Sequence, residues 1–132
     1  MKRYVEEPGS GTVRRLLARG AAATSRLSEV EVASALARRC REGTLSRRER
    51  DRALAALSAD VAAMWVVELT PEVAQASVAL LTRHPLRTGD GVQLASCLYI
   101  KLQTGDEVSL LAYDSRLNEA ARTEGVPLLA LR

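Results

Sequence analysis

The alternation of apolar and polar positions predicts short strands separated by amphipathic helices. Apolar residues recur at helical spacing in six segments that begin at polar capping residues or end near glycine. These predicted helices cover residues 12–19, 28–41, 46–63, 71–82, 90–103 and 115–124. Short apolar or small-residue runs predict strands at 21–27, 65–69, 108–113 and 126–131. Strands that alternate with helices favour an α/β fold, a three-layer sandwich around a mostly parallel sheet of about four strands.

Local signals fix where several helices begin. Ser28 with Glu31, and Ser46 with Glu49, have the spacing of a capping box, in which the serine and the glutamate each bond the other's backbone N–H. Thr70 precedes Pro71 and predicts the N-cap of the next helix. The run at 65–69 is β-branched and apolar, which predicts a buried strand with Trp65 in the core.

The length of 132 residues predicts one domain over residues 1–132. A hydrophobic content of 47% is too high for a disordered chain. No apolar run approaches the roughly 18 residues of a membrane span, and no signal-peptide pattern opens the chain. We therefore expect a cytoplasmic protein without a membrane partner.

Several kinds of site are excluded by the residues that the chain lacks. Cys40 and Cys97 have no CxxC spacing, and His84 is the only histidine, so the sequence disfavours zinc sites and disulfide scaffolds. A Ser-His-Asp triad would depend on His84, which precedes a proline in a predicted turn. Gly9 and Gly11 follow no predicted strand, and no Gly-Lys-Ser/Thr motif is present, so the phosphate-binding signatures of nucleotide enzymes are absent from the sequence.

The net charge of +3 is too small to indicate a nucleic-acid partner by itself. The type of basic residue is more informative, because Lys2 and Lys101 are the only lysines and the other 17 basic residues are arginines. Arginine matches phosphate oxygens with two parallel hydrogen bonds, which suits a polyanion. GC-rich coding explains the same bias without any function.

Three acidic residues stand at the ends of predicted elements. Asp114 directly follows the strand that ends at Tyr113, where ligands bind in open parallel sheets, although it also fits an acid at a helix N-terminus. Asp90 begins a helix and Glu31 lies one turn into another, where both also fit capping roles. Carboxylates gathered at one point need a cation, and hard oxygen ligands select Mg²⁺ or Mn²⁺.

At these residues the chain resembles PIN-domain proteins of the VapC toxin type, the ribonuclease components of toxin–antitoxin pairs. The matching stretches are residues 2–10, 24–38, 86–95, 111–121 and 124–126. Together they extend over nearly the whole chain, and their order and spacing are more specific than any one of them.

The resemblance implies that Glu31, Asp90 and Asp114 are the catalytic residues and ligate Mg²⁺ or Mn²⁺. Glu31 is preferred over Glu29 because the family's acid directly precedes a run like the Val-Ala-Ser-Ala-Leu at 32–36. Such an ion polarises the scissile phosphate and activates water, so the implied activity is endonucleolytic hydrolysis of RNA phosphodiester bonds.

Further residues are expected to border the site. Ser25 matches a polar position of the family, and Asn118 lies one turn along the helix that follows Asp114. Arg87 and Arg116 are the arginines expected to bind RNA phosphates, although solvated surface charge is an equally good reading of either. The expected partners are a cognate antitoxin protein, the RNA substrate and a second copy of the chain.

The sequence departs from the family at its start. PIN proteins open with a strand that carries the first metal-binding aspartate, and this sequence begins after that point, at Met1. The domain is therefore expected to be N-terminally truncated relative to the family, without its first strand. The alternative function is a catalytically impaired PIN-like module that binds protein or RNA.

Overall fold

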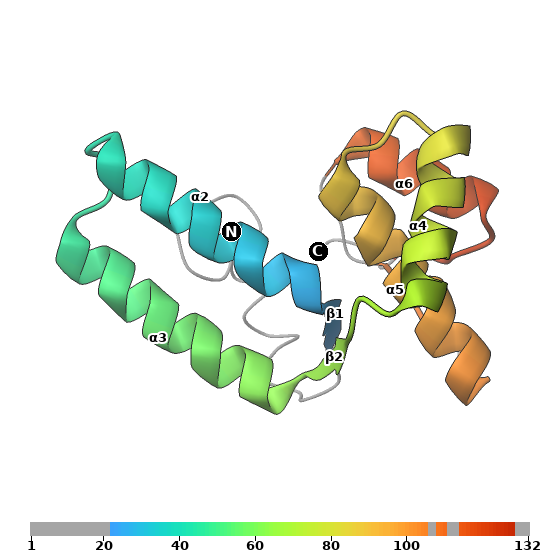
Figure 1. Ribbon diagram of the computed structural model, residues 1–132, viewed down its shortest axis with the longest axis horizontal. Helices are drawn as coiled ribbons and strands as arrows, with labels where there is room; N and C mark the ends of the chain where they lie inside the picture. Colours follow the sequence, from blue (N-terminus) through green and yellow to red (C-terminus); the bar gives the residue numbers. More distant parts are fainter. Residues whose placement is uncertain (1–21, 106–107, 111–113, 129–132) are drawn as a thin grey trace. The chain divides into compact units, whose positions relative to one another are not determined.

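The computed structural model describes residues 22–105, 108–110 and 114–128 (Figure 1). It is a mixed α/β structure, mostly helical, with one short parallel two-stranded sheet in the described residues. The elements follow the order β1 (Ala23–Ser25), α2 (Arg26–Arg41), α3 (Arg47–Ala63), β2 (Trp65–Val67), α4 (Pro71–Arg83), α5 (Thr88–Thr104) and α6 (Ser115–Thr123). The predicted α/β class is confirmed. The predicted helix at 12–19 lies outside the described residues.

The described residues form two compact units. The first contains residues 22–23 and 28–66, and therefore nearly all of α2 and the whole of α3. The second contains residues 24–27 and the described residues from 67 to 128, which include α4, α5 and α6. Each unit has its own buried apolar cluster.

Helices α2 and α3 form an antiparallel hairpin in the first unit (Figure 1). Leu36 of α2, Leu45 of the connecting turn and Ala53 of α3 form its buried cluster. The predicted capping box of α3 is confirmed: Oγ of Ser46 accepts from the N–H of Glu49, and the Glu49 carboxylate accepts from the N–H of Ser46, both at 3.0 Å. This reciprocal pair fixes the turn against the first residues of α3.

The predicted start of α2 at Ser28 is wrong. The helix begins at Arg26, directly after the last residue of β1, so Ser28 lies within the first turn and is not the N-cap. The pattern correctly predicts a helix, but it places the start at residue 28, two residues after the observed start. The strand leads into the helix without a loop. Glu31 is an exposed residue of α2.

The second unit is built around α5. Its buried side chains, among them Leu94 and Ile100, pack with Val73 and Leu80 of α4 in one apolar cluster. Thr70 caps α4 as predicted, with its Oγ1 accepting from the N–H of Val73 at 3.3 Å. Helix α5 ends at Thr104, and the φ of 70° at its C-cap residue Gly105 lies in the left-handed region that favours glycine.

In the described parts of the segments predicted as the third and fourth strands, Leu110 and Leu128 form a parallel bridge. The N–H of Leu110 donates to the carbonyl of Pro127 at 2.9 Å. The rest of these two predicted strands falls largely on residues 111–113 and 129–131, which lie outside the described residues.

Trp65 is not a core residue, contrary to the prediction. It is 47% exposed, whereas Val67, at the other end of β2, is 3% exposed. A sheet that has two strands of three residues in the described part of the chain is too small to cover an indole side chain. Within the described ranges, no helix is long and apolar enough to cross a membrane.

Candidate functional site

Two predicted site residues stand at the N-terminal ends of helices in the second unit. Asp90 lies in the first turn of α5, whose N-cap is Arg87. Asp114 is the N-cap of α6. Both carboxylates therefore lie where backbone N–H groups point out of a helix and favour negative charge.

Asp114 is held in place by the helix that it caps. Its Oδ1 accepts from the backbone N–H of Leu117 at 3.1 Å and of Arg116 at 2.9 Å. These hydrogen bonds, with the charges of Arg116 and Arg87, hold the pKa of Asp114 below its ordinary value. The carboxylate thus stays ionised, and the cap uses Oδ1 only. Of the two readings that the sequence left open for Asp114, the structure shows the capping role through Oδ1, and the role as a metal ligand stays a prediction.

Asp90 has the opposite electrostatic environment. Its partial burial, and then the negative charge of Asp114, raise its pKa above the ordinary value, while the charges of Arg87 and Arg116 act in the other direction. The charges of three other residues singled out from the sequence, one carboxylate and two guanidinium groups, therefore act on the carboxyl group of Asp90. We call Asp90 and Asp114 the acidic pair, and Arg87 and Arg116 its flanking arginines.

The carboxyl end of β1 is joined to the same helix. Ser25 is buried, and its N–H donates to Oε1 of Gln93 at 3.2 Å, while Oγ1 of Thr24 donates to the same oxygen at 3.5 Å. Gln93 lies three residues after Asp90, so the two side chains emerge on one side of α5. Sequence reasoning missed Gln93, although its spacing from Asp90 was a usable signal. That Ser25 borders a functional site stays a prediction.

The other predicted residues are placed as follows. Asn118 begins the second turn of α6, where its N–H donates to the carbonyl of Asp114 at 3.0 Å, and its Oδ1 is buried. Glu31 belongs to the first unit. Within residues 22–105, 108–110 and 114–128, no group of three or more Asp, Glu, His or Cys side chains is arranged to hold a metal ion. That Glu31 joins Asp90 and Asp114 stays a prediction.

The donor chemistry of the acidic pair fits a hard cation. Carboxylate oxygens are the ligands that Mg²⁺ and Mn²⁺ prefer. Burial is the first cause of the raised pKa of Asp90 and the charge of Asp114 is the second, and a divalent ion held by both carboxylates would offset this second effect.

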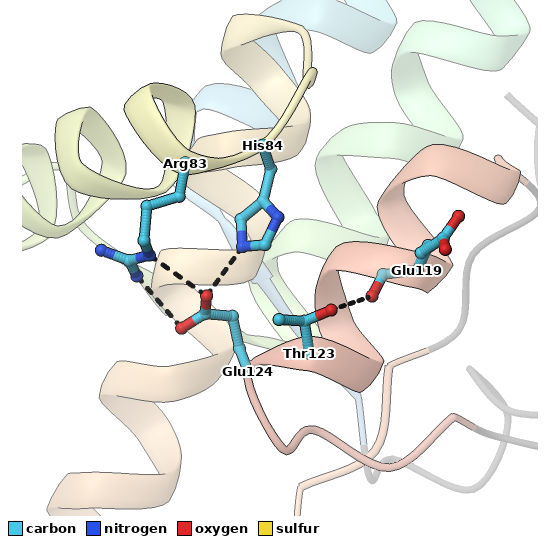
Figure 2. A network of polar contacts seen from close by, with 5 residues as sticks. All are labelled: Arg83, His84, Glu119, Thr123 and Glu124. Atoms are coloured by element: carbon cyan, nitrogen blue, oxygen red, sulfur yellow. Dashed lines mark hydrogen bonds and ion pairs between the residues drawn. The ribbon is translucent and has the colours of Figure 1, made fainter.

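A separate polar network joins the ends of α4 and α6 (Figure 2). Nε2 of His84 lies 2.7 Å from Oε2 of Glu124, and Arg83 donates to both oxygens of that carboxylate, at 3.0 and 3.3 Å. His84, the only histidine of the chain, is the C-cap residue of α4. Its contacts tie two helix ends together, which accounts for its position without a catalytic role.

A comparison with protein families matches the PIN domain over residues 4–123. The match covers most of the chain and extends across both units, and the chain belongs to the PIN domain family. Proteins of this family are generally nucleases that use divalent metal ions. No curated protein matches the sequence.

Proposed function

We propose that this PIN-domain protein is a metal-dependent endoribonuclease and the toxin component of a toxin–antitoxin module. Family membership supports nuclease activity in general. The observation that carries the proposal is that the charges of Asp114, Arg87 and Arg116 all act on the carboxyl group of Asp90, in the first turn of α5. The carboxylates provide oxygen ligands for a cation, and the guanidinium groups match phosphate oxygens, so the two kinds of group suit the binding of a metal ion and of a phosphodiester.

Asp90 and Asp114 would hold Mg²⁺ or Mn²⁺, with Glu31 proposed as the third ligand. When bound, the ion supplies positive charge that polarises the scissile phosphate. The chain's own residues arrange the remainder of the site. The backbone N–H groups of Arg116 and Leu117 fix the orientation of Asp114, and the hydrogen bond from Ser25 to Gln93 fixes the side of α5 that carries Asp90.

Arg87 and Arg116 would hold the RNA backbone. Both side chains are exposed and both interact with the acidic pair, so a phosphate bound beside the carboxylates would be within the reach of positive charge. Contacts of this kind position the strand and do not read its bases. Asn118 and Ser25 are proposed to border the same place.

The nuclease proposal is tested by cleavage of a fluorescently labelled single-stranded RNA with Mn²⁺ and with a chelator. We expect the Asp90→Asn and Asp114→Asn variants to lose activity at least about a hundredfold, and the chelator to abolish it. Glu119→Gln is the matched control, because Glu119 is an exposed acid of α6 and its substitution removes the same charge. Equal activity in Asp114→Asn and wild type would reject the site. RNA binding without cleavage in the wild type would favour the impaired binding module.

The toxin proposal needs measurements in cells and on assemblies. Induced expression of the wild-type chain is expected to arrest growth, and expression of Asp114→Asn is not. An antitoxin protein is expected to relieve the arrest, and a second copy of the chain is expected in solution by sedimentation. Growth arrest that is the same for both versions of the chain would argue against RNA cleavage as its cause.

A further inference from the structure

The tip of the α2–α3 hairpin carries an unusual density of positive charge. Seven arginines fall within residues 38–52, against three acidic residues, Glu42, Glu49 and Asp51. Five of the arginines are exposed, and we call these five the hairpin-tip arginines: Arg38, Arg41, Arg47, Arg48 and Arg52. They lie in the last turn of α2 and the first turns of α3, on either side of the connecting turn (Figure 1).

Local stability does not explain the arginines of α3. Arg38 and Arg41 lie at the C-terminal end of α2, where positive charge is favoured by the helix dipole. Arg47 and Arg48 are the first two residues of α3, where the same dipole disfavours positive charge. A sequence selected for stability alone would place acidic residues at these two positions.

Neighbouring acids offset only part of this charge. Glu49 is engaged with Ser46 in the capping box and its charge interacts with that of Arg52, while Asp51 pairs with Arg50 at 3.0 Å. Among the described residues, Arg38, Arg41, Arg47 and Arg48 make no hydrogen bond or ion pair through their side chains. The guanidinium groups therefore keep their donors for a ligand.

The surroundings favour a phosphate backbone over a protein surface. Protein interfaces have an apolar and aromatic centre with a polar rim. The exposed large apolar side chains of the described residues, Val30, Trp65, Leu69, Val78 and Leu102, all lie outside residues 38–52. Leu45, the large apolar residue of the tip, is buried against Leu36 and Ala53, which holds the turn that separates the two groups of arginines.

We propose that the hairpin-tip arginines are an RNA-binding surface that holds the phosphate backbone without reading sequence. The inference rests on the proposed function for the choice of RNA, and it adds a binding surface in the first unit to the cleavage site proposed around Asp90 and Asp114. Arginine forks contact the phosphates of a single strand, and the affinity arises from the release of counterions.

The test is the binding of a labelled oligouridylate of about 20 nucleotides to the full chain, by fluorescence anisotropy at several salt concentrations. A chelator is present throughout, so binding is measured apart from cleavage. The Arg47→Gln/Arg48→Gln variant is expected to bind roughly ten to thirty times more weakly at about 0.1 M salt, with the slope of log K against log salt reduced by about 1.4. Because the variant removes charges that oppose the helix dipole, its melting temperature is expected to be unchanged or higher.

The matched control is Lys101→Gln/Arg122→Gln, which removes two exposed positive charges from α5 and α6. Retention of wild-type binding by this control supports a specific surface, and an equal loss in both variants overturns it. Polyglutamate of similar length is the second probe, and tighter binding of polyglutamate than of RNA overturns the choice of RNA in favour of an acidic protein. Failure of the nuclease proposal gives a different result, namely unchanged RNA binding without cleavage.

Discussion

Asp90 and Asp114 interact across the starts of two helices, and their pKa values are shifted in opposite directions. Hydrogen bonds from Leu117 and Arg116 stabilise the charge of Asp114, whereas burial and the charge of Asp114 disfavour that of Asp90. The pair therefore has one fixed anion and one carboxylate whose ionisation costs free energy. A bound cation would offset this cost, so metal binding is expected to be coupled to the ionisation of Asp90.

The Asp90→Asn variant is expected to be more stable than wild type near pH 7, by on the order of 0.5 kcal/mol. The pKa of Asp90 is higher in the folded chain than its ordinary value of 3.8, so the folded state is penalised as pH rises through and above that range. The gain is expected to disappear near pH 3, where the carboxyl is protonated in both folded and unfolded chains. Thermal unfolding at the two pH values measures it. A gain in stability of equal size at both pH values would contradict a raised pKa for Asp90. Glu119→Gln serves as the control.

The two substitutions Asp114→Asn and Asp114→Ala separate the cap from the ligand role. Asparagine keeps an oxygen that accepts from the N–H groups of Leu117 and Arg116, and it is as good an N-cap as aspartate. Alanine removes the acceptor. We expect both variants to lose Mn²⁺ binding in calorimetry, and only Asp114→Ala to show a clearly lower melting temperature.

The sign of the charge effect at Asp114 follows from its lowered pKa. The folded state favours the carboxylate, so this stabilisation is present above about pH 3.8 and is lost as pH falls through the lower folded value. Asp114→Asn is therefore expected to melt at or slightly below the wild-type temperature near neutral pH. Mn²⁺ affinity equal to that of wild type would remove Asp114 from the proposed site.

The Glu124→Gln variant is expected to destabilise the second unit by roughly 1 kcal/mol near pH 7. Hydrogen bonds from His84 and then Arg83 lower the pKa of Glu124, so its contribution is present above about pH 4.5 and is lost as pH falls through the lower folded value. Chemical denaturation near pH 7 and near pH 3 measures the difference, which is expected to shrink in acid.

The control for this network is Arg83→Gln. The side chain of Arg83 is 51% exposed, compared with 12% for His84, so its ion pair with Glu124 is better screened by solvent. We expect a loss below about 0.5 kcal/mol. A loss as large as that of Glu124→Gln would show that Arg83, and not His84, is the main partner of Glu124.

Gly91→Ala tests the close packing of α4 on α5. A Cβ at this position would lie 2.8 Å from Cγ and Cδ2 of Leu81. The resulting strain is expected to cost about 1 to 3 kcal/mol, which exceeds the gain of up to about 1 kcal/mol from replacing glycine within a helix. In a Leu81→Ala background the same substitution is expected to be neutral or stabilising, measured by a double-mutant cycle. A Gly91→Ala variant more stable than wild type would contradict this packing.

Local signals in the sequence predicted most helix boundaries correctly. The capping box of Ser46 and Glu49 and the Thr70-Pro71 pair operate through hydrogen bonds and backbone angles within a few residues. The start of α2 was wrong because the same local pattern at Ser28 fell inside a helix that begins directly after β1. Local patterns alone cannot show which of two nearby starts the packed chain adopts.

The candidate site was partly predictable. Position and family resemblance singled out Asp90, Asp114, Arg87 and Arg116, and in the folded chain the charges of the last three act on the pKa of Asp90, after the effect of its burial. The contacts of Gln93 with Thr24 and Ser25 were not predicted, because they join residues 69 and 68 positions apart. The role of Glu31 as a third ligand stays a prediction.

The sequence by itself determined the helical segments, the α/β class and the acids and arginines available for chemistry, because these depend on residue type and on neighbours a few positions away. Only the tertiary structure decided that Trp65 is exposed, that burial and the charge of Asp114 raise the pKa of Asp90, and that His84 is held by Glu124. Burial and charge interaction depend on distances between side chains from different elements, and those distances exist only after the helices have packed.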